Sequence, residues 1–113
     1  MNLGDKIYLR HILERIADIE ASTCNVSEKE FKGSNDLIDA NIRRIEVIGE
    51  AAKNVSLKTK NEYPEIEWKQ IAGTRDVLIH AYFSVDLDLV WTIIKKDLKI
   101  LKKQIEKILQ KED

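Results

Sequence analysis

An apolar seam in the last part of the chain repeats at alternating spacings of four and three residues. Such spacing places side chains on one face of an α-helix, because 3.6 residues complete each turn. The seam consists of Leu87, Trp91, Ile94, Leu98, Leu101, Ile105 and Ile108. It predicts a long helix that begins at Asp86 or Asp88 and packs in a coiled coil or an antiparallel bundle. Because the chain has only 113 residues, we favour the bundle.

The same predicted helix carries four apolar residues away from this seam. They are Leu89, Val90, Ile93 and Ile100. These positions predict a second buried face, which a second copy of the chain would cover in a homodimer.

Three other stretches show the apolar spacing of a helix. The predicted helices cover approximately residues 5–22, 35–54 and 68–80. Asp5 is the expected N-cap of the first, and Ser34 or Asn35 that of the second. Gly73 lies inside the third, where glycine costs about 1 kcal/mol relative to alanine, so we expect close packing or a bend there.

Shorter segments connect these helices. Ser27–Glu30 matches a capping box and predicts a short helical turn that carries Phe31 and ends at Gly33. The segment 55–67 is expected to be irregular, because the residue before Pro64 is disfavoured in the α conformation. No stretch alternates as a strand would. The sequence therefore predicts an all-α, up-down bundle of four to five helices in a single domain over residues 1–113.

The charge and cysteine content exclude several functional classes. Lys and Arg number 19 against 20 Asp and Glu, so any nucleic-acid binding must depend on a local patch. Cys24 is the single cysteine, which excludes an intramolecular disulfide and favours a reducing compartment. The N-terminal residues resemble neither a secretory signal nor a membrane span. We therefore expect a cytoplasmic protein without a bound metal or cofactor.

The segment Arg75–Tyr82 gathers an arginine, an aspartate, a histidine and a tyrosine within eight residues. A guanidinium binds phosphate through paired hydrogen bonds, and an imidazole transfers protons near neutral pH. RNA cleavage without a metal needs such groups: a base, an acid and a cation for the developing phosphorane charge. The segment therefore predicts phosphate chemistry.

Helix geometry constrains how these side chains cooperate. Arg75 and His80 lie about 140° apart around an ideal helix, whereas Asp76 and His80, four residues apart, share a face. A twofold axis near this region would bring two copies of Arg75 and His80 together. A purely structural interpretation also stands: Arg75 in a surface ion pair, His80 at a helix C-terminus, and the Tyr82 ring packed against Phe83.

The pattern Arg75-x4-His80-x-Tyr82 resembles the signature of the HEPN superfamily, and more closely that of the HepT-like toxins of MntA and HepT toxin–antitoxin pairs. Two flanking segments strengthen the likeness. Arg43–Ala52 resembles the family's helix that ends in Gly-Glu-Ala, and Phe83–Trp91 resembles its link into the last helix. The resemblance spans nearly the whole chain.

This resemblance implies an all-α homodimer with a composite cleft, acting as a metal-independent endoribonuclease on tRNA or mRNA. It assigns Arg75 and His80 as catalytic residues and Asp76 as a supporting one. Tyr82 would receive AMP from a nucleotidyltransferase antitoxin and so silence the toxin. Glu50 either supports the site or belongs to a small-residue stretch that permits close helix packing.

Other polar and aromatic residues leave alternatives open. A basic strip on the last predicted helix either binds RNA or the antitoxin, or is an ordinary solvated face. It contains Lys95, Lys99, Lys102, Lys103 and Lys107. His11 is expected to be partly buried or at an interface rather than a ligand, and Trp68 and Trp91 to pack in the core.

The sequence therefore predicts the ribonuclease toxin of a toxin–antitoxin pair. The alternative is a non-enzymatic helical dimer that binds a nucleotidyltransferase and its nucleotide substrate. The two differ at His80, since only the enzyme would lose RNA cleavage when this histidine is replaced.

Overall fold

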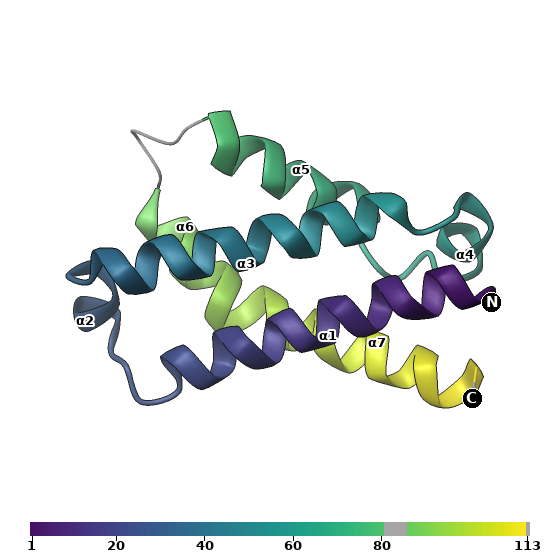
Figure 1. Cartoon of the computed structure of the whole chain (residues 1–113), viewed down its shortest axis with the longest axis horizontal. Helices are drawn as coiled ribbons and strands as arrows, with labels where there is room; N and C mark the ends of the chain where they lie inside the picture. The colour runs from purple at the N-terminus through teal and green to yellow at the C-terminus, as the bar shows by residue number, and fades with distance from the viewer. Residues whose placement is uncertain (81–85, 113) are drawn as a thin grey trace.

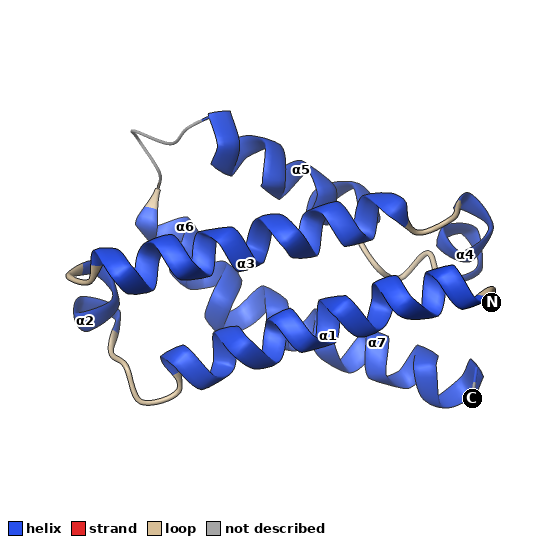
Figure 2. Ribbon diagram, in the orientation of Figure 1, coloured by secondary structure: helices blue, strands red, loops and turns tan. Residues whose placement is uncertain are grey.

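The computed structural model describes the backbone of residues 1–80 and 86–112 and the side chains of residues 1–74 and 86–112. Every regular element in this part of the chain is a helix (Figure 2). The elements are α1 (Leu3–Thr23), α2 (Glu28–Lys32), α3 (Asn35–Asn54), α4 (Leu57–Glu62), α5 (Trp68–His80), α6 (Leu87–Thr92), the π-helical turn η1 (Ile93–Asp97) and α7 (Leu98–Glu112). The all-α prediction is confirmed.

The long helices run up and down, as predicted, with α3 between α1 and α5 (Figure 1). The last helix, formed by α6, η1 and α7 without a break, crosses behind α1 and packs against it. Both termini lie at one end of the bundle, and the end of α5 lies toward the other (Figure 1). The core between these helices is rich in isoleucine, and Leu9, Ile16 and Ile105 are completely buried.

The predicted N-cap of α1 is wrong by one turn. Asn2 caps the helix, and its side-chain oxygen accepts the backbone N–H of Asp5 at 2.7 Å. Asp5 is instead buried, where its carboxylate accepts hydrogen bonds from Ser56 and Thr59. A carboxylate suits an N-cap, but here its partners lie in a distant part of the chain.

Two other predicted helix starts are confirmed. Ser27 and Glu30 form the capping box of α2, and Phe31 is fully buried. Ser34, the first of the two candidate residues, caps α3 by accepting the N–H of Leu37.

The predicted irregular segment contains a short helix, α4, that the sequence analysis missed. Ser56 caps it and accepts the N–H of Thr59. Its apolar residue Leu57 is 72% exposed, so α4 has no buried apolar stripe that periodicity would detect. The helix ends at Glu62, and its C-cap Tyr63, the residue before Pro64, is not helical, as proline sterics favour.

The last helix begins at Leu87 and is capped by Asp86, whose side chain accepts the N–H groups of Asp88 and Leu89. The π-helical turn was not predicted. Within it the N–H of Leu98 donates to the carbonyl of Ile93, five residues earlier. Because this turn contains one residue more than an α-helical turn, it changes which positions of the following helix face the core.

The predicted second apolar face is buried only in part. Val90 and Ile93 are buried within the chain itself, whereas Leu89 and Ile100 are 42% and 51% exposed. Val90 and Ile93 therefore need no second copy to cover them.

The close packing expected at Gly73 is not found. A Cβ atom added there would meet no heavy atom of the described residues within 4 Å. Trp68, at the start of the same helix, is buried as expected, and its indole N–H donates to the carbonyl of Tyr63 at 3.0 Å. Trp91 is partly buried, and its ring centroid lies 5.2 Å from that of Phe31.

Candidate active site

Helix α5 carries three of the predicted site residues near its C-terminal end. Its continuous backbone includes Arg75, Asp76 and His80, and it ends at His80. The side chains of these three residues lie outside the described part, as does the whole of Tyr82. Along this backbone, Asp76 and His80 are one helical turn apart, whereas Arg75 is offset from His80 by about 140°.

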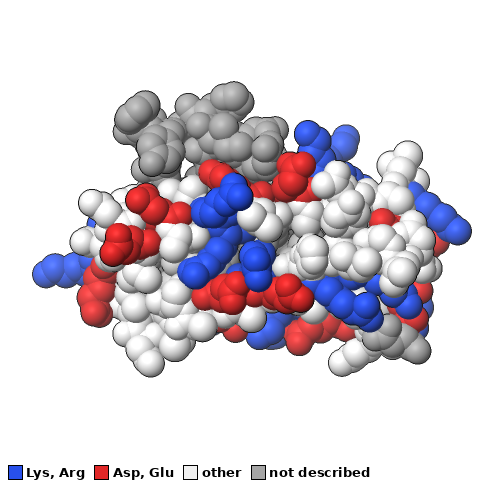
Figure 3. All heavy atoms as spheres, in the orientation of Figure 1, with Lys and Arg blue, Asp and Glu red and all other residues white. Residues whose placement is uncertain are grey.

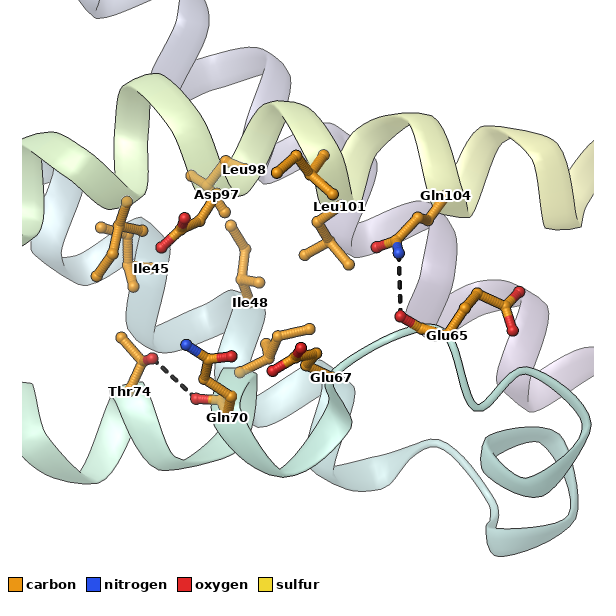
Figure 4. Close-up of a pocket in the computed structure, with 13 residues that line it drawn as sticks. Ile45, Ile48, Glu65, Glu67, Gln70, Thr74, Asp97, Leu98, Leu101 and Gln104 are labelled. Carbon is orange, nitrogen blue, oxygen red and sulfur yellow. Dashed lines mark hydrogen bonds between the residues drawn. The ribbon is translucent and has the colours of Figure 1, made fainter.

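A groove lies between α3, α5 and the last helix, with a volume of about 220 Å³ (Figure 4). Its apolar surface includes Ile45, Ile48, Leu98 and Leu101. Across one end, the Gln104 side-chain N–H donates to the carbonyl of Glu65 at 3.1 Å, which ties α7 to the segment before α5.

The described charged residues that line this groove are acidic. They are Glu65, Glu67 and Asp97. Three carboxylates give the described part of the lining a negative potential, which disfavours an anionic ligand.

Glu50 lies on another side of α3 and is exposed. It lines a hollow of about 260 Å³ between α1 and α3. The described lining of this hollow comprises Tyr8, His11, Arg43, Glu46, Val47, Glu50, Ala51 and Asn54. The guanidinium of Arg43 lies 3.9 Å from the carboxylate of Glu46, so the hollow contains both charge signs.

His11 also lines this hollow. It is exposed on α1 rather than partly buried, and its alternative place at an interface stays a prediction. The sequence indicates the α3 side of this hollow, because Arg43, Glu46 and Glu50 recur at helical spacing on one side of α3. Which face of α1 meets them cannot be read from local periodicity.

The basic strip lies mainly on α7 and begins in η1. Lys95 donates to the carbonyl of Thr23 at 2.9 Å, and its ammonium lies 4.8 Å from the ring centroid of Trp91. Lys102 forms an ion pair of 3.1 Å with Glu20.

A second hollow lies beside this strip, where α7 approaches the end of α1. It is lined by Glu20, Cys24, Lys99, Lys102, Lys103 and Glu106. Among the described side chains, no group of three or more His, Cys, Asp and Glu residues is arranged to hold a metal ion. Cys24 is therefore not part of a described metal cluster.

A tyrosine with a raised pKa, Tyr63, lies at the other end of the bundle from the end of α5. The phenol of Tyr63 donates to Glu112 at 2.6 Å, and this bond, with burial, raises the pKa of Tyr63 to about 12. The same bond lowers the pKa of Glu112, which also pairs with the N-terminal ammonium at 3.3 Å. This cluster ties the two termini together.

The face of the molecule seen in Figure 3 carries charges of both signs. In the view of Figure 3, Lys and Arg side chains are interspersed with Asp and Glu. None of the described helices combines the length and the hydrophobicity that a membrane span requires.

Comparison with known families gives one match over most of the chain. The family model described as "Ribonuclease HepT-like" matches residues 12–108. The matched region includes the α5 motif and all five lysines of the basic strip. No solved structure shows a significant match.

Curated relatives cover nearly the whole chain. A Thermococcus cleftensis protein named "Probable ribonuclease HepT" is 41% identical over 96% of this chain and 98% of its own length. A Methanocaldococcus jannaschii protein named "Gamma-glutamylcyclotransferase and putative RNase" is 50% identical over 96% of this chain. The chain spans 49% of that longer relative.

Proposed function

Because the chain belongs to the HepT-like ribonuclease family, we propose that it is an endoribonuclease that cleaves RNA without a metal ion through Arg75 and His80. The observation that carries this proposal is the family match over residues 12–108, which contains both residues on one continuous helix. The substrate is tRNA or mRNA, and the site of action is the cytoplasm.

The proposed reaction is an internal transesterification. A base takes the proton of a 2′-hydroxyl, and the 2′-oxygen bonds to the adjacent phosphorus. The bond from phosphorus to the 5′-oxygen breaks, and an acid protonates this oxygen as it leaves. The products are a 2′,3′-cyclic phosphate and a 5′-hydroxyl. His80 exchanges the protons, and the Arg75 guanidinium stabilises the phosphorane charge.

A single imidazole cannot act as both the base and the acid in one step, and one copy of α5 carries only one His80. We therefore place two copies of α5 about a twofold axis, so that a homodimer contributes two His80 and two Arg75 side chains to one cleft. Asp76, one turn before His80, orients the imidazole and favours its charged form. Glu50 supports the same site from α3.

Tyr82 provides the proposed switch. A nucleotidyltransferase antitoxin attaches AMP to the phenol oxygen, and pyrophosphate leaves from ATP. The attached phosphate then occupies the position of the substrate phosphate near Arg75, while its bulk excludes RNA. The chain is thus the toxin of a toxin–antitoxin pair.

The first test incubates purified, unmodified protein with total tRNA in EDTA and resolves the products at single-nucleotide length. Mass spectrometry first establishes that Tyr82 carries no AMP. We expect the parent to cleave tRNA and the Arg75→Ala and His80→Ala variants to lose this activity. Lys58→Ala, an exposed change on α4, is the control and should cleave like the parent.

Intact tRNA with unmodified parent protein would contradict the proposal. It would favour instead a non-enzymatic dimer that binds the nucleotidyltransferase. Equal cleavage by parent and His80→Ala would place the activity elsewhere or in a contaminant.

A further inference from the structure

Asp97 and three lysines of the last helix line different hollows. Asp97 lines the groove toward α3 and α5, where the described charged lining residues are acidic. Lys99, Lys102 and Lys103 line the hollow toward α1, together with Glu20 and Glu106. In a chain with a net charge of −1, these lysines form a local group of positive charges on the α1 side of α7.

The lysines on this side form a stripe rather than a scatter. Lys99, Lys102, Lys103 and Lys107 of α7 fall within an arc of about 140° on an ideal helix, which also includes Glu106, and Lys95 precedes them in η1. The stripe is about 18 Å long from Lys95 to Lys107, at 1.5 Å per residue. Lys99, Lys103 and Lys107 are exposed.

Two of these lysines are held in position. Lys95 is fixed by the carbonyl of Thr23 and the ring of Trp91, and Lys102 by Glu20. Among the described residues, Lys99, Lys103 and Lys107 form no ion pair with an acidic group. Their charges are therefore available to a ligand, although Glu20 and Glu106 also line the hollow.

The stripe is continuous with the element that follows the motif. The last helix starts at Leu87, five residues after Tyr82, and runs without interruption through the stripe. Lys95 lies about 12 Å along the axis from that start, and Lys107 about 30 Å. The stripe therefore begins about two helical turns after the start of the element that follows the motif.

We propose that this lysine stripe on α7 binds the phosphate backbone of the RNA beyond the scissile bond. The proposal rests on the ribonuclease function proposed above and adds a binding surface to it. Because lysine binds phosphate as a point charge, the stripe contributes affinity without sequence preference. Each phosphate contact releases bound counterions. For a single strand, each contact therefore makes the slope of log affinity against log salt concentration steeper by about 0.7.

The test compares two charge reversals of equal size. Lys99→Glu with Lys103→Glu alters the stripe, and Lys58→Glu with Lys69→Glu alters exposed positions on α4 and α5. Both are placed in the full chain with His80→Ala, so that RNA is bound but not cut. Fluorescence anisotropy with a labelled single-stranded RNA in EDTA, over a series of salt concentrations, gives the affinity and its salt slope.

We expect the stripe variant to bind RNA at least about tenfold more weakly and to lose about 1.4 from the salt slope, corresponding to two contacts. The control pair should stay within about twofold of its parent. Lys99→Gln with Lys103→Gln should show a smaller loss in the same direction. Circular dichroism melting checks that all variants fold alike.

A second readout separates this surface from the chemistry. With His80 restored, the stripe variant should cleave a dinucleotide at the parental rate, because so short a substrate does not reach α7, but should cleave tRNA with a raised KM. No RNA binding by the parent, equal weakening by both charge reversals, or an unaffected stripe variant would overturn the proposal.

The two proposals fail in different ways. Weaker RNA binding by the stripe variant, with no cleavage by any protein, would remove the ribonuclease function and leave the RNA-binding surface. Cleavage by the parent with unchanged RNA affinity in the stripe variant would remove the surface alone. If that variant instead lost only its binding to the nucleotidyltransferase, the stripe would be a protein-binding surface and the RNA proposal would be wrong.

Discussion

The carboxylate of Asp5 accepts the backbone N–H of Ser56 at 2.9 Å, although 51 residues separate them in the sequence. The same carboxylate accepts the hydroxyls of Ser56 and Thr59 at 2.6 Å each. One buried acid therefore connects the first turn of α1 to the cap of α4. Burial by itself raises the pKa of Asp5, but the hydrogen bonds outweigh it and leave this pKa below its ordinary value.

Replacing Asp5 with alanine should reduce the free energy of unfolding by about 2 kcal/mol at pH 7, because it leaves buried donors without an acceptor. Urea denaturation measures this change. Since the folded-state pKa is lowered, the charge-dependent stabilisation is present above the unfolded value of 3.8 and is lost as pH falls through the folded pKa. The difference from the parent should therefore shrink below about pH 4. Asp39→Ala, at an exposed position, is the control, and an equal effect from it would refute this role for Asp5.

Phe31→Ala should destabilise the chain by about 3 to 5 kcal/mol, because it empties a fully buried site. Its ring contacts Trp91, so the variant should also shift the tryptophan emission. Chemical denaturation followed by fluorescence reports both effects. Lys29→Ala on the same short helix is exposed and should change stability by less than about 0.5 kcal/mol.

Gly73→Ala should stabilise the chain by about 1 kcal/mol, because alanine is the better helix former and its Cβ meets no described atom within 4 Å. Thermal denaturation at several protein concentrations is the measurement. A lower Tm for the variant would contradict this expectation and indicate that another chain packs against this position.

The phenol of Tyr63 should ionise with a pKa of about 12. Its hydrogen bond to Glu112 and its burial favour the neutral form, so the phenolate appears only at higher pH than for a solvated tyrosine. Ultraviolet absorbance titration of the parent and of Tyr63→Phe isolates this group among the three tyrosines of the chain. A difference curve centred near pH 10, the unperturbed value, would contradict the bond to Glu112.

The sequence predicts most of the helices because their determinants are local. The α2 capping box and the Ser34 and Asp86 caps depend on neighbouring residues. The position of Asp5 could not be predicted in this way, because its partners come from α4. The π-helical turn is also set by tertiary packing, which buries both Ile93 and Ile94 although they are adjacent in the sequence.

For the candidate site, too, the sequence predicts the local features but not those that depend on distant helices. The α5 motif can be read from the sequence as residue types and spacing, and the structure confirms the helix that carries Arg75 and His80 up to its end. The hollow that each side chain of the last helix lines depends on which helices face it, so only the fold reveals that Asp97 and Lys99 line different hollows. The roles of Arg75, Asp76, His80 and Tyr82 stay predictions.

The chemistry of the cut RNA ends is the first measurement to make, because it reports directly on acid–base cleavage at His80. The parent protein is incubated with tRNA in EDTA, and the new ends are labelled with polynucleotide kinase, which phosphorylates 5′-hydroxyls. We predict 5′-hydroxyl and 2′,3′-cyclic phosphate ends with the parent and none with His80→Ala. New 5′-phosphate ends, or the same ends produced by His80→Ala, would contradict acid–base cleavage at this histidine.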